Sequence, residues 1–358
     1  MREIDADNAA AYLVEAGQLP AGMAVDIREL GGGVSNQVLL VQPAGRSPWV
    51  IKQARERLRV PQPWFCSVER IRREIDVLRR CQQLLGRQPV APTTHPAPAI
   101  QTPELIFEDR DNYLFGMTAA PMPHSTWKER LMCGEPNTAI AAACGGLLGR
   151  LHAGTWQDAD VARELDDRQF FAELRIDPYF REVARVHEDL RPAIERLIES
   201  VWHHRRCLVH GDFSPKNLLV WDGGLMLIDF EVGHFGDPAF DLGFFLTHLV
   251  LKSFRAGRDA GRYLSLIDSF WAAYVQSLAS STASGELPDL EARTAQNLAG
   301  CLLARVDGKS RVDYPTDVDS VRRLARRLLG SPPAPWNVTM TTIREFVPGR
   351  LVPGGMRV

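Results

Sequence analysis

The feature that most constrains the fold of this chain is a polar stretch set among three short apolar runs, between Cys207 and Glu231. The runs cover residues 207–209, 218–221 and 225–228, and each is typical of a buried strand. Asp222-Gly223-Gly224 separates the second run from the third and predicts a tight hairpin. We expect the hairpin to be centred on Gly223, so that Asn217 faces Asp229 at about 4.5–5.5 Å.

Three polar side chains in this stretch have the spacing of a phosphoryl-transfer site. The amide oxygen of Asn217 and the carboxylate of Asp229 are the kind of ligand that Mg²⁺ prefers, so both are predicted metal ligands. Asp212 precedes Asn217 by a short loop and is the predicted catalytic residue, which accepts a hydrogen bond from a substrate hydroxyl. Positioning and electrostatics do most of the work in phosphoryl transfer, with ATP and Mg²⁺ as the implied cofactors. Any one of the three could instead be a buried residue that caps a turn, but the set favours a kinase site.

The pattern His210-Gly211-Asp212, four further residues, Asn217 and then Asp229 resembles the aminoglycoside phosphotransferase and choline kinase superfamily. That superfamily shares its fold with protein kinases. The resemblance implies an α+β, two-lobed fold with an N-terminal nucleotide-binding lobe at residues 1–121, built from an antiparallel sheet and one main helix. It also implies a larger, mostly helical C-terminal lobe at residues 122–358 that carries catalysis and acceptor binding.

Two acidic residues after the hairpin have alternative interpretations. The segment 236–243 also resembles the superfamily, which implies that Asp241 binds the backbone of the catalytic loop. Asp241 also precedes the apolar run 242–251, so it is a candidate N-cap of a helix. Glu231 either assists metal binding or caps a turn.

A glycine-rich turn near the N-terminus is the first predicted contact with the nucleotide. Residues 27–30 and 37–41 are predicted strands, and Gly32, Gly33 and Ser35 lie in the turn between them. Glycines allow backbone N–H groups to approach phosphate, and a serine hydroxyl adds a donor. An ordinary glycine-rich hairpin turn would explain the same residues.

A lysine and a glutamate complete the predicted phosphate side. Lys52 follows an apolar strand, where the kinase fold carries its phosphate-binding lysine. A helix starting at Ser67 has an apolar face, and Glu74 borders it, which makes Glu74 the predicted partner of Lys52. Alternatively, Glu74 is a solvated helix charge paired with a nearby arginine. The resemblance also implies a hinge at residues 118–121, where Thr118 and Ala120 would contact adenine through their backbone.

A narrower resemblance concerns the phosphate acceptor. Residues 50–54, followed by Trp64, Ser67 and Glu69-Arg70, are similar to methylthioribose kinases of the same superfamily. A methylthioribose-like sugar is therefore the first candidate acceptor, beside other sugars, amino sugars, amino alcohols and antibiotics. A charged segment, Arg305–Ser310, either lines the acceptor site or holds the C-terminal helices together.

The whole chain has the composition of a globular protein that acts on small molecules. It has 358 residues, of which 45% are hydrophobic and 24% charged, with a formal net charge of −2. Neither nucleic-acid nor membrane partners are expected, because there is no basic field and no apolar run near the ~18 residues of a membrane span. The N-terminal residues lack a signal core, and the six cysteines form no CxxC pair, so reduced thiols and a cytoplasmic location are expected.

Three other functions compete with a small-molecule kinase. A protein kinase is disfavoured because Gly211 replaces the arginine that reads an activation loop, and only nine residues separate Glu231 from Asp241. A metal-dependent hydrolase using His210 and Asp212 would leave the Lys52 and Glu74 positions unexplained. A non-catalytic pseudokinase is disfavoured because the three site residues of the hairpin region are all present.

Overall fold

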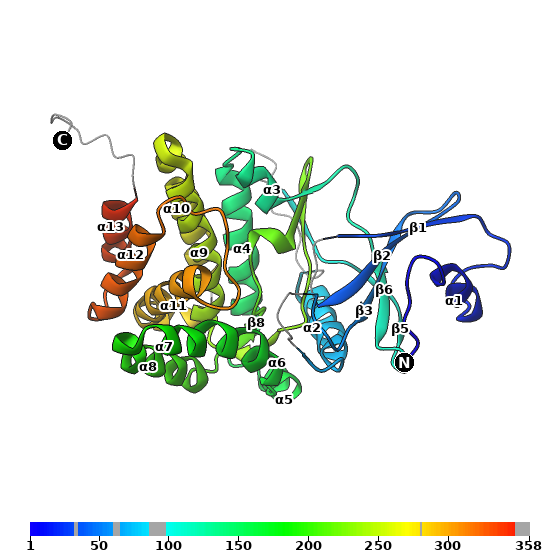
Figure 1. Cartoon of the computed structure of the whole chain (residues 1–358), viewed down its shortest axis with the longest axis horizontal. Helices are drawn as coiled ribbons and strands as arrows, with labels where there is room; N and C mark the ends of the chain where they lie inside the picture. Colours follow the sequence, from blue (N-terminus) through cyan, green and yellow to red (C-terminus); the bar gives the residue numbers. More distant parts are fainter. Residues whose placement is uncertain (32–34, 60–64, 86–97, 280, 348–358) are drawn as a thin grey trace.

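The computed structural model describes residues 1–31, 35–59, 65–85, 98–279 and 281–347. Figure 1 shows an elongated molecule with a sheet-containing N-terminal part at one end and a helical C-terminal part at the other. The predicted α+β fold is confirmed, with an antiparallel sheet and one main helix before residue 119. The boundary at residues 121 and 122 stays a prediction.

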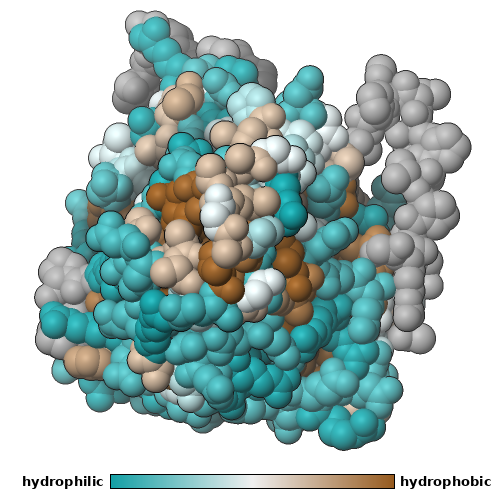
Figure 2. Space-filling view, turned by 90° about the vertical axis from the view of Figure 1, so that its right-hand side faces the viewer, coloured by the Kyte–Doolittle hydropathy of each residue, from teal (hydrophilic) through white to brown (hydrophobic). Residues whose placement is uncertain are grey.

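The N-terminal part is built around a five-stranded sheet with the strand order β1-β2-β3-β6-β5, in which all neighbours are antiparallel. Its elements are α1 (Ala9–Glu15), β1 (Val25–Glu29), β2 (Asn36–Pro43), β3 (Trp49–Ala54), α2 (Arg70–Leu85), β4 (Ala99–Gln101), β5 (Leu105–Asp109) and β6 (Leu114–Thr118). α1 buries Tyr12 and Leu13 in a small apolar core with Leu39, Val41 and Ile51 of the sheet. Figure 2 views this end of the molecule and shows apolar residues gathered near its middle, surrounded by hydrophilic ones.

α2 lies between the sheet and the helical part (Figure 1). It begins at Arg70, three residues after the predicted start, and it buries Ile71, Ile75 and Leu78 as the apolar face predicts. Glu74 is buried with them rather than bordering the face. The helix therefore carries a carboxylate into the space between the two parts of the chain.

Helices dominate the C-terminal part. They are α3 (Trp127–Met132), α4 (Thr138–Gly154), α5 (Ala159–Leu165), α6 (Gln169–Phe171), α7 (Glu182–Val186), α8 (Arg191–His203), α9 (Pro238–Ala256), α10 (Ala260–Leu278), α11 (Leu287–Asp307), α12 (Val318–Gly330) and α13 (Trp336–Phe346). The other helical segments are the π-helix η1 (Ala172–Arg181) and the 3₁₀ segments η2 (Glu188–Leu190), η3 (Pro215–Asn217), η4 (Gly257–Asp259) and η5 (Thr282–Glu286). In the described residues, no helix is both long and apolar enough to cross a bilayer.

The strands of the C-terminal part are short and surround the predicted catalytic loop. They are β7 (Ser125–Thr126), β8 (Cys207–Val209), β9 (Leu218–Trp221), β10 (Gly224–Leu227) and β11 (His234–Gly236). β9 and β10 form the predicted hairpin, β4 pairs with β10 in parallel, and β7 pairs with β9. The N-terminal strand β4 thus joins a sheet of the C-terminal part.

The predicted register of the hairpin is wrong by one residue. Trp221 pairs with Gly224 and Leu218 with Leu227, so the turn contains two residues, Asp222 and Gly223, instead of being centred on Gly223. Two-residue turns match strand twist when the backbone is left-handed, and Gly223 has φ +81°. Asn217 is consequently opposite Ile228, whose N–H donates to the Asn217 carbonyl at 3.0 Å.

The charged segment at the end of α11 contains contacts that hold helices together. Asp307 accepts hydrogen bonds from Arg322 of α12 at 2.7 Å and lies 2.8 Å from Nε2 of His187. Burial of Asp307 opposes its ionisation, but these two partners hold its pKa below the usual value. For Asp307, the structure thus favours the structural interpretation.

Candidate active site

The catalytic loop begins where β8 ends and is fixed by Asp241 of α9. The fully buried Asp241 carboxylate accepts hydrogen bonds from the N–H groups of His210 at 2.7 Å and Gly211 at 2.8 Å. The predicted contact of Asp241 with the loop backbone is confirmed. Its N-cap interpretation is wrong, because Asp237 caps α9 by accepting from the Ala239 N–H.

Gly211 is required by the path of this loop. Its φ is +75°, and a Cβ at this position would lie 2.8 Å from the carbonyl oxygen of Val232. Any side chain here would therefore meet both backbone strain and a clash. The small residue directs the chain so that the next side chain, Asp212, faces the site.

Asp212 is buried and held by three groups. Arg175 of η1 lies 2.7 Å from Oδ1, and Lys216 lies 2.8 Å from Oδ2. The Asn217 side-chain amide donates to Oδ2 at 2.8 Å and to the Asp212 carbonyl at 2.9 Å. Burial favours the neutral acid, but the charges of Arg175 and Lys216 outweigh burial and hold the pKa of Asp212 below its usual value.

Asp229 begins a second charged group directly after the hairpin. It has φ +72°, a left-handed conformation that aspartate tolerates better than most residues. Lys52 of β3 donates to Asp229 at 2.5 Å and to Glu74 at 2.7 Å, so the predicted ion pair between Lys52 and Glu74 is present. The hairpin does not place Asp229 directly across from Asn217; a backbone turn at Asp229 directs its side chain instead.

The charge states of this second group follow from burial and pairing. Burial opposes ionisation of Lys52, but Asp229 and Glu74 outweigh it and raise the lysine pKa above its usual range. Burial likewise opposes ionisation of Asp229, and the charges of Lys52 and Lys216 hold its pKa well below the usual value. Burial raises the pKa of Glu74 in spite of the adjacent lysine. At neutral pH the site therefore contains ionised Asp212 and Asp229 beside a protonated Lys52.

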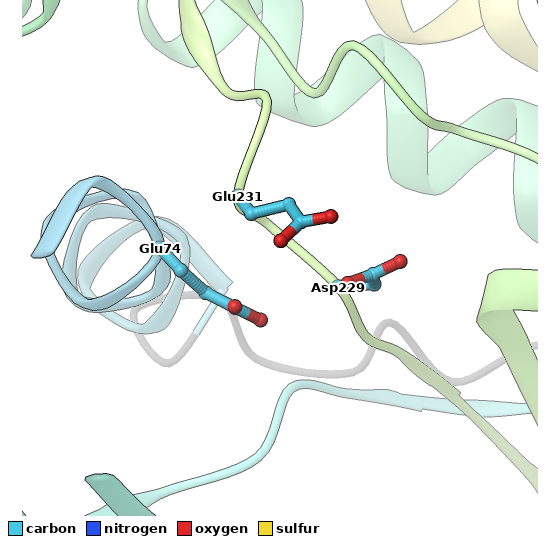
Figure 3. A group of neighbouring side chains, drawn as sticks. All are labelled: Glu74, Asp229 and Glu231. Carbon is cyan, nitrogen blue, oxygen red and sulfur yellow. The ribbon is translucent and has the colours of Figure 1, made fainter. Parts of the chain in front are cut away.

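Three carboxylates of the described chain lie close enough to share a cation. Oxygen atoms of Glu74, Asp229 and Glu231 lie within 4.8 Å of one another (Figure 3). Oxygen-only ligands suit Mg²⁺, and the buried Glu74 Oε2 atom has no hydrogen-bond partner in the described chain. The donor set therefore fits a hard divalent cation; it includes Glu231, for which metal binding is one of two interpretations, and Glu74, which the sequence pattern assigns to Lys52 instead.

Glu231 binds the glycine-rich turn to the rest of the site. Ser35 donates its hydroxyl to Glu231 at 2.7 Å, Asn36 donates its side-chain amide at 2.9 Å, and buried Arg70 donates at 3.1 Å. The Ser35 hydroxyl, a predicted phosphate donor, is thus bonded to a carboxylate. Gly32 and Gly33 lie outside the described residues.

The predicted hinge follows β6 directly. The Thr118 N–H donates to the Glu104 carbonyl at 2.9 Å and its hydroxyl accepts from the Glu104 N–H, so both groups serve the strand connection. Ala120 is buried, and its N–H makes no backbone hydrogen bond with another described residue. Of the two positions, Ala120 has the backbone donor that is available to a ligand.

Two residues of the site were missed by sequence reasoning. Lys216 lies within the motif, and its spacing of four from Asp212 is a usable signal. Arg175 lies far from the motif, in a segment without any recognisable pattern. Only the packing of η1 against the catalytic loop, where Arg175 also donates to the Gly211 carbonyl at 2.7 Å, shows its role.

Comparison with known proteins identifies the family. The model of a family described as "Phosphotransferase enzyme family" (APH) matches residues 26–274. The chain belongs to this family. Every described site residue above lies within the matched range.

Methylthioribose kinases are among the relatives of this phosphotransferase family member. The one from Cronobacter sakazakii is 27% identical over 281 residues, which cover 70% of this chain and 66% of the relative. The one from Citrobacter koseri is 25% identical over 257 residues, covering 64% of this chain and 60% of the relative. The chain therefore matches just under two thirds of the length of these curated relatives.

Solved structures show the phosphotransferase fold. Choline kinase from Cryptosporidium parvum Iowa II superposes with a TM-score of 0.53 at 12% identity, covering 96% of each chain. An amicoumacin kinase superposes with a TM-score of 0.50 at 15% identity, covering 90% of this chain and 94% of that one. The kinase-like fold expected from the motif is thus confirmed.

Replacing Asp241 by alanine should destabilise this family member. The change leaves two buried N–H groups without acceptors, at a cost of about 1–3 kcal/mol for each. Urea unfolding of wild type and Asp241→Ala gives the difference. Asp259→Ala, at an exposed position without a side-chain cap bond, is the matched control and should stay within about 0.5 kcal/mol. A loss for Asp241→Ala as small as that of the control would contradict the assigned role.

Proposed function

We propose that this protein is an ATP-dependent kinase that transfers the γ-phosphoryl group to a hydroxyl of a small molecule. The observation that carries the proposal is the ionised, buried Asp212 beside the charged group of Lys52 and Asp229. This arrangement supplies a hydrogen-bond acceptor for a hydroxyl and a cation for phosphate oxygens. Phosphoryl transfer needs little more than such positioning and charge.

Asp212 is the catalytic residue of the proposed reaction. One carboxylate oxygen is held by Arg175, which fixes its orientation. The other is bonded by Lys216, whose side chain is 47% exposed and therefore free to move when the acceptor hydroxyl takes its place. Asp212 then aligns the hydroxyl and accepts its proton as the hydroxyl oxygen bonds to the γ-phosphorus, while the bond from that phosphorus to the β,γ-bridging oxygen breaks and ADP leaves. Lys216 remains close enough to meet the charge of the transferred group.

Lys52, Asp229 and Asn217 form the nucleotide and metal side. Lys52 neutralises phosphate oxygens, and Glu74 holds its ammonium group in place. Asp229 is the best placed carboxylate for Mg²⁺, since the oxygens of Glu231 are already bonded by Ser35, Asn36 and Arg70. A bound Mg²⁺ supplies charge neutralisation between phosphates. Gly32, Gly33, Ser35, Thr118 and Ala120 remain proposed nucleotide contacts.

The relatives support a sugar-like acceptor. Methylthioribose kinases are among the relatives that match this chain, so a methylthioribose-like sugar is the first acceptor to test. A protein substrate is disfavoured, because β11 and the start of α9 take up most of the nine residues between Glu231 and Asp241 and leave no length for an activation loop.

An ATP-consumption screen over hydroxyl-bearing compounds tests the proposal. The panel contains methylthioribose, sugars, sugar acids and phosphates, amino sugars, amino alcohols and aminoglycosides, each with Mg²⁺. We expect ADP release that depends on one acceptor class, with a product heavier by one phosphoryl group. Tight Mg²⁺–ATP binding without any turnover would favour a pseudokinase. Tight zinc binding without ATP binding would favour a metal-dependent hydrolase. Turnover only of peptides would favour a protein kinase.

A further inference from the structure

A buried lysine in α9 has no carboxylate partner. Lys252 is 2% exposed, and within the described residues its Nζ atom donates a single hydrogen bond, at 3.4 Å, to the His248 carbonyl. It also lies 4.8 Å from the ring centroid of Tyr314. No carboxylate of the described chain lies within 4.0 Å of Nζ, and the remaining residues of the sequence contain neither Asp nor Glu. Burial of an unpaired ammonium group is costly, so its presence calls for an explanation.

Two further basic side chains each have a buried nitrogen atom without a hydrogen-bond partner in the described chain. His248 is 5% exposed; its Nδ1 atom lies 3.2 Å from the Tyr314 hydroxyl, and its Nε2 atom has no partner in the described chain. In the part of the chain that the structure describes, the hydrogen-bond partners of Arg305 of α11 are all neutral: the hydroxyl of Tyr179 and the Ser310 side chain and carbonyl. Its Nε atom is buried and unbonded among the described residues.

This group of cations adjoins the catalytic carboxylate. The Arg175 guanidinium that binds Asp212 lies 5.5 Å from the Phe244 ring, and Phe244 packs edge-to-face on His248 at 5.3 Å. Tyr179, whose hydroxyl accepts a hydrogen bond from Arg305, packs on the same Phe244 ring at 5.8 Å. Burial lowers the pKa of His248, and the charges of Arg305, Lys252, Lys216 and Lys128 add to this effect. Lys128 lies on α3, which packs against η3 of the catalytic loop. We call Lys128, His248, Lys252 and Arg305 the acceptor-side cluster.

We propose that the phosphate acceptor carries an anionic group, a carboxylate or a phosphate, that is bound by the acceptor-side cluster. This inference rests on the proposed kinase function and narrows its substrate class from sugars in general, including neutral methylthioribose, to acceptors that carry a negative charge. Cationic acceptors such as aminoglycosides or choline would be repelled by the charges of Lys128 and Arg305 and by Lys252 in its protonated form. A hydroxylated acid or a sugar phosphate carries both a hydroxyl that can hydrogen-bond to Asp212 and a negative charge that can pair with the cluster. Lysine and arginine bind such anions through charge-assisted hydrogen bonds.

Matched acceptor pairs test the substrate class. Gluconate is compared with glucose and glucosamine, glycerate with glycerol, and ribose 5-phosphate with ribose. We expect kcat/KM to be at least about tenfold higher for an anionic member than for its neutral partner, which corresponds to about 1.4 kcal/mol. The gluconate and glycerate pairs test for a carboxylate on the acceptor, and the ribose 5-phosphate pair tests for a phosphate. Lys252→Met and Arg305→Gln should raise KM for the anionic acceptor, whereas Lys309→Met, at an exposed lysine outside the cluster, should not.

A binding experiment keeps the inference testable without turnover. Thermal unfolding of the nucleotide-free protein is followed with gluconate and with inorganic phosphate at constant ionic strength. Wild type should gain Tm with one of these anions, and Lys252→Met should lose that gain while having a higher Tm in their absence. A merely structural lysine would instead give a lower Tm on substitution.

The effect of pH provides a second signature. Burial and the charges of Lys128, Arg305 and Arg255 lower the pKa of Lys252 to about 7, against 10.5 for an ordinary lysine. The buried charge of Lys252 therefore lowers the free energy of unfolding by its full amount below pH 7. This destabilisation decreases as the pH rises toward 10.5. The Tm advantage of Lys252→Met should shrink over the same range, with His248 and Tyr314 present in both proteins.

The outcomes separate this inference from the kinase proposal. Turnover of neutral or cationic acceptors alone would overturn the anionic acceptor and leave the kinase function standing. An anion-dependent Tm gain that Lys252→Met abolishes, without turnover of any acceptor, would support the anion site and count against the kinase. Absence of any anion effect on wild type would overturn the inference.

Discussion

Asp212→Ala should reduce phosphoryl transfer by about 10²–10⁴-fold or more in kcat. The substitution removes the carboxylate that Arg175, Lys216 and Asn217 hold together, and with it the group that aligns the acceptor hydroxyl. ATP affinity should persist, because Lys52 and Asp229 on the nucleotide side keep their contacts. Steady-state kinetics and nucleotide titration together measure both effects.

Two further variants make the result on Asp212 interpretable. Asp212→Asn keeps the shape of the side chain and should lose almost as much kcat, since the amide accepts a proton poorly. Asp222→Ala, at the exposed turn of the same hairpin, should leave kcat unchanged. Full activity of Asp212→Ala would remove Asp212 from the mechanism.

Asp229→Asn should act on nucleotide binding itself. Asparagine tolerates the left-handed backbone at this position, so the change removes charge with little strain. We expect affinity for the Mg²⁺–ATP complex to fall at least about tenfold, about 1.4 kcal/mol, because Lys52 is left with Glu74 alone and the ion loses a carboxylate.

Calorimetric titration with and without Mg²⁺ isolates the metal contribution. The benefit that Mg²⁺ gives to ATP binding in wild type should largely disappear in Asp229→Asn. Asp222→Asn is the matched control, because it makes the same chemical change at the solvent-exposed hairpin turn. An unchanged affinity for Mg²⁺–ATP would exclude Asp229 as a metal ligand.

Short-range spacing in the sequence was enough to predict much of the site. Three local patterns carried most of this prediction: a hairpin signal, a strand followed by Lys52, and an amphipathic helix with Glu74. The regular geometry of hairpins, strands and helices fixes where the side chains of such patterns lie. The ion pair of Lys52 with Glu74 agrees with these patterns, whereas the contact of Asp241 with the catalytic loop was implied by the resemblance to the superfamily. The hairpin register was wrong by one residue because the length of a turn depends on backbone dihedrals that Asp222-Gly223-Gly224 does not specify uniquely.

The sequence by itself therefore determined the class of fold and the chemistry of the motif, both of which depend on neighbours a few residues apart. Tertiary structure decided which distant charges surround that motif: Arg175 on Asp212, Glu231 on Ser35, and unpaired Lys252 beside His248. Such pairings join segments tens to hundreds of residues apart, and no local pattern encodes them. They arise only when packing removes water from around the charges, so that burial and proximity together set each pKa and each partner.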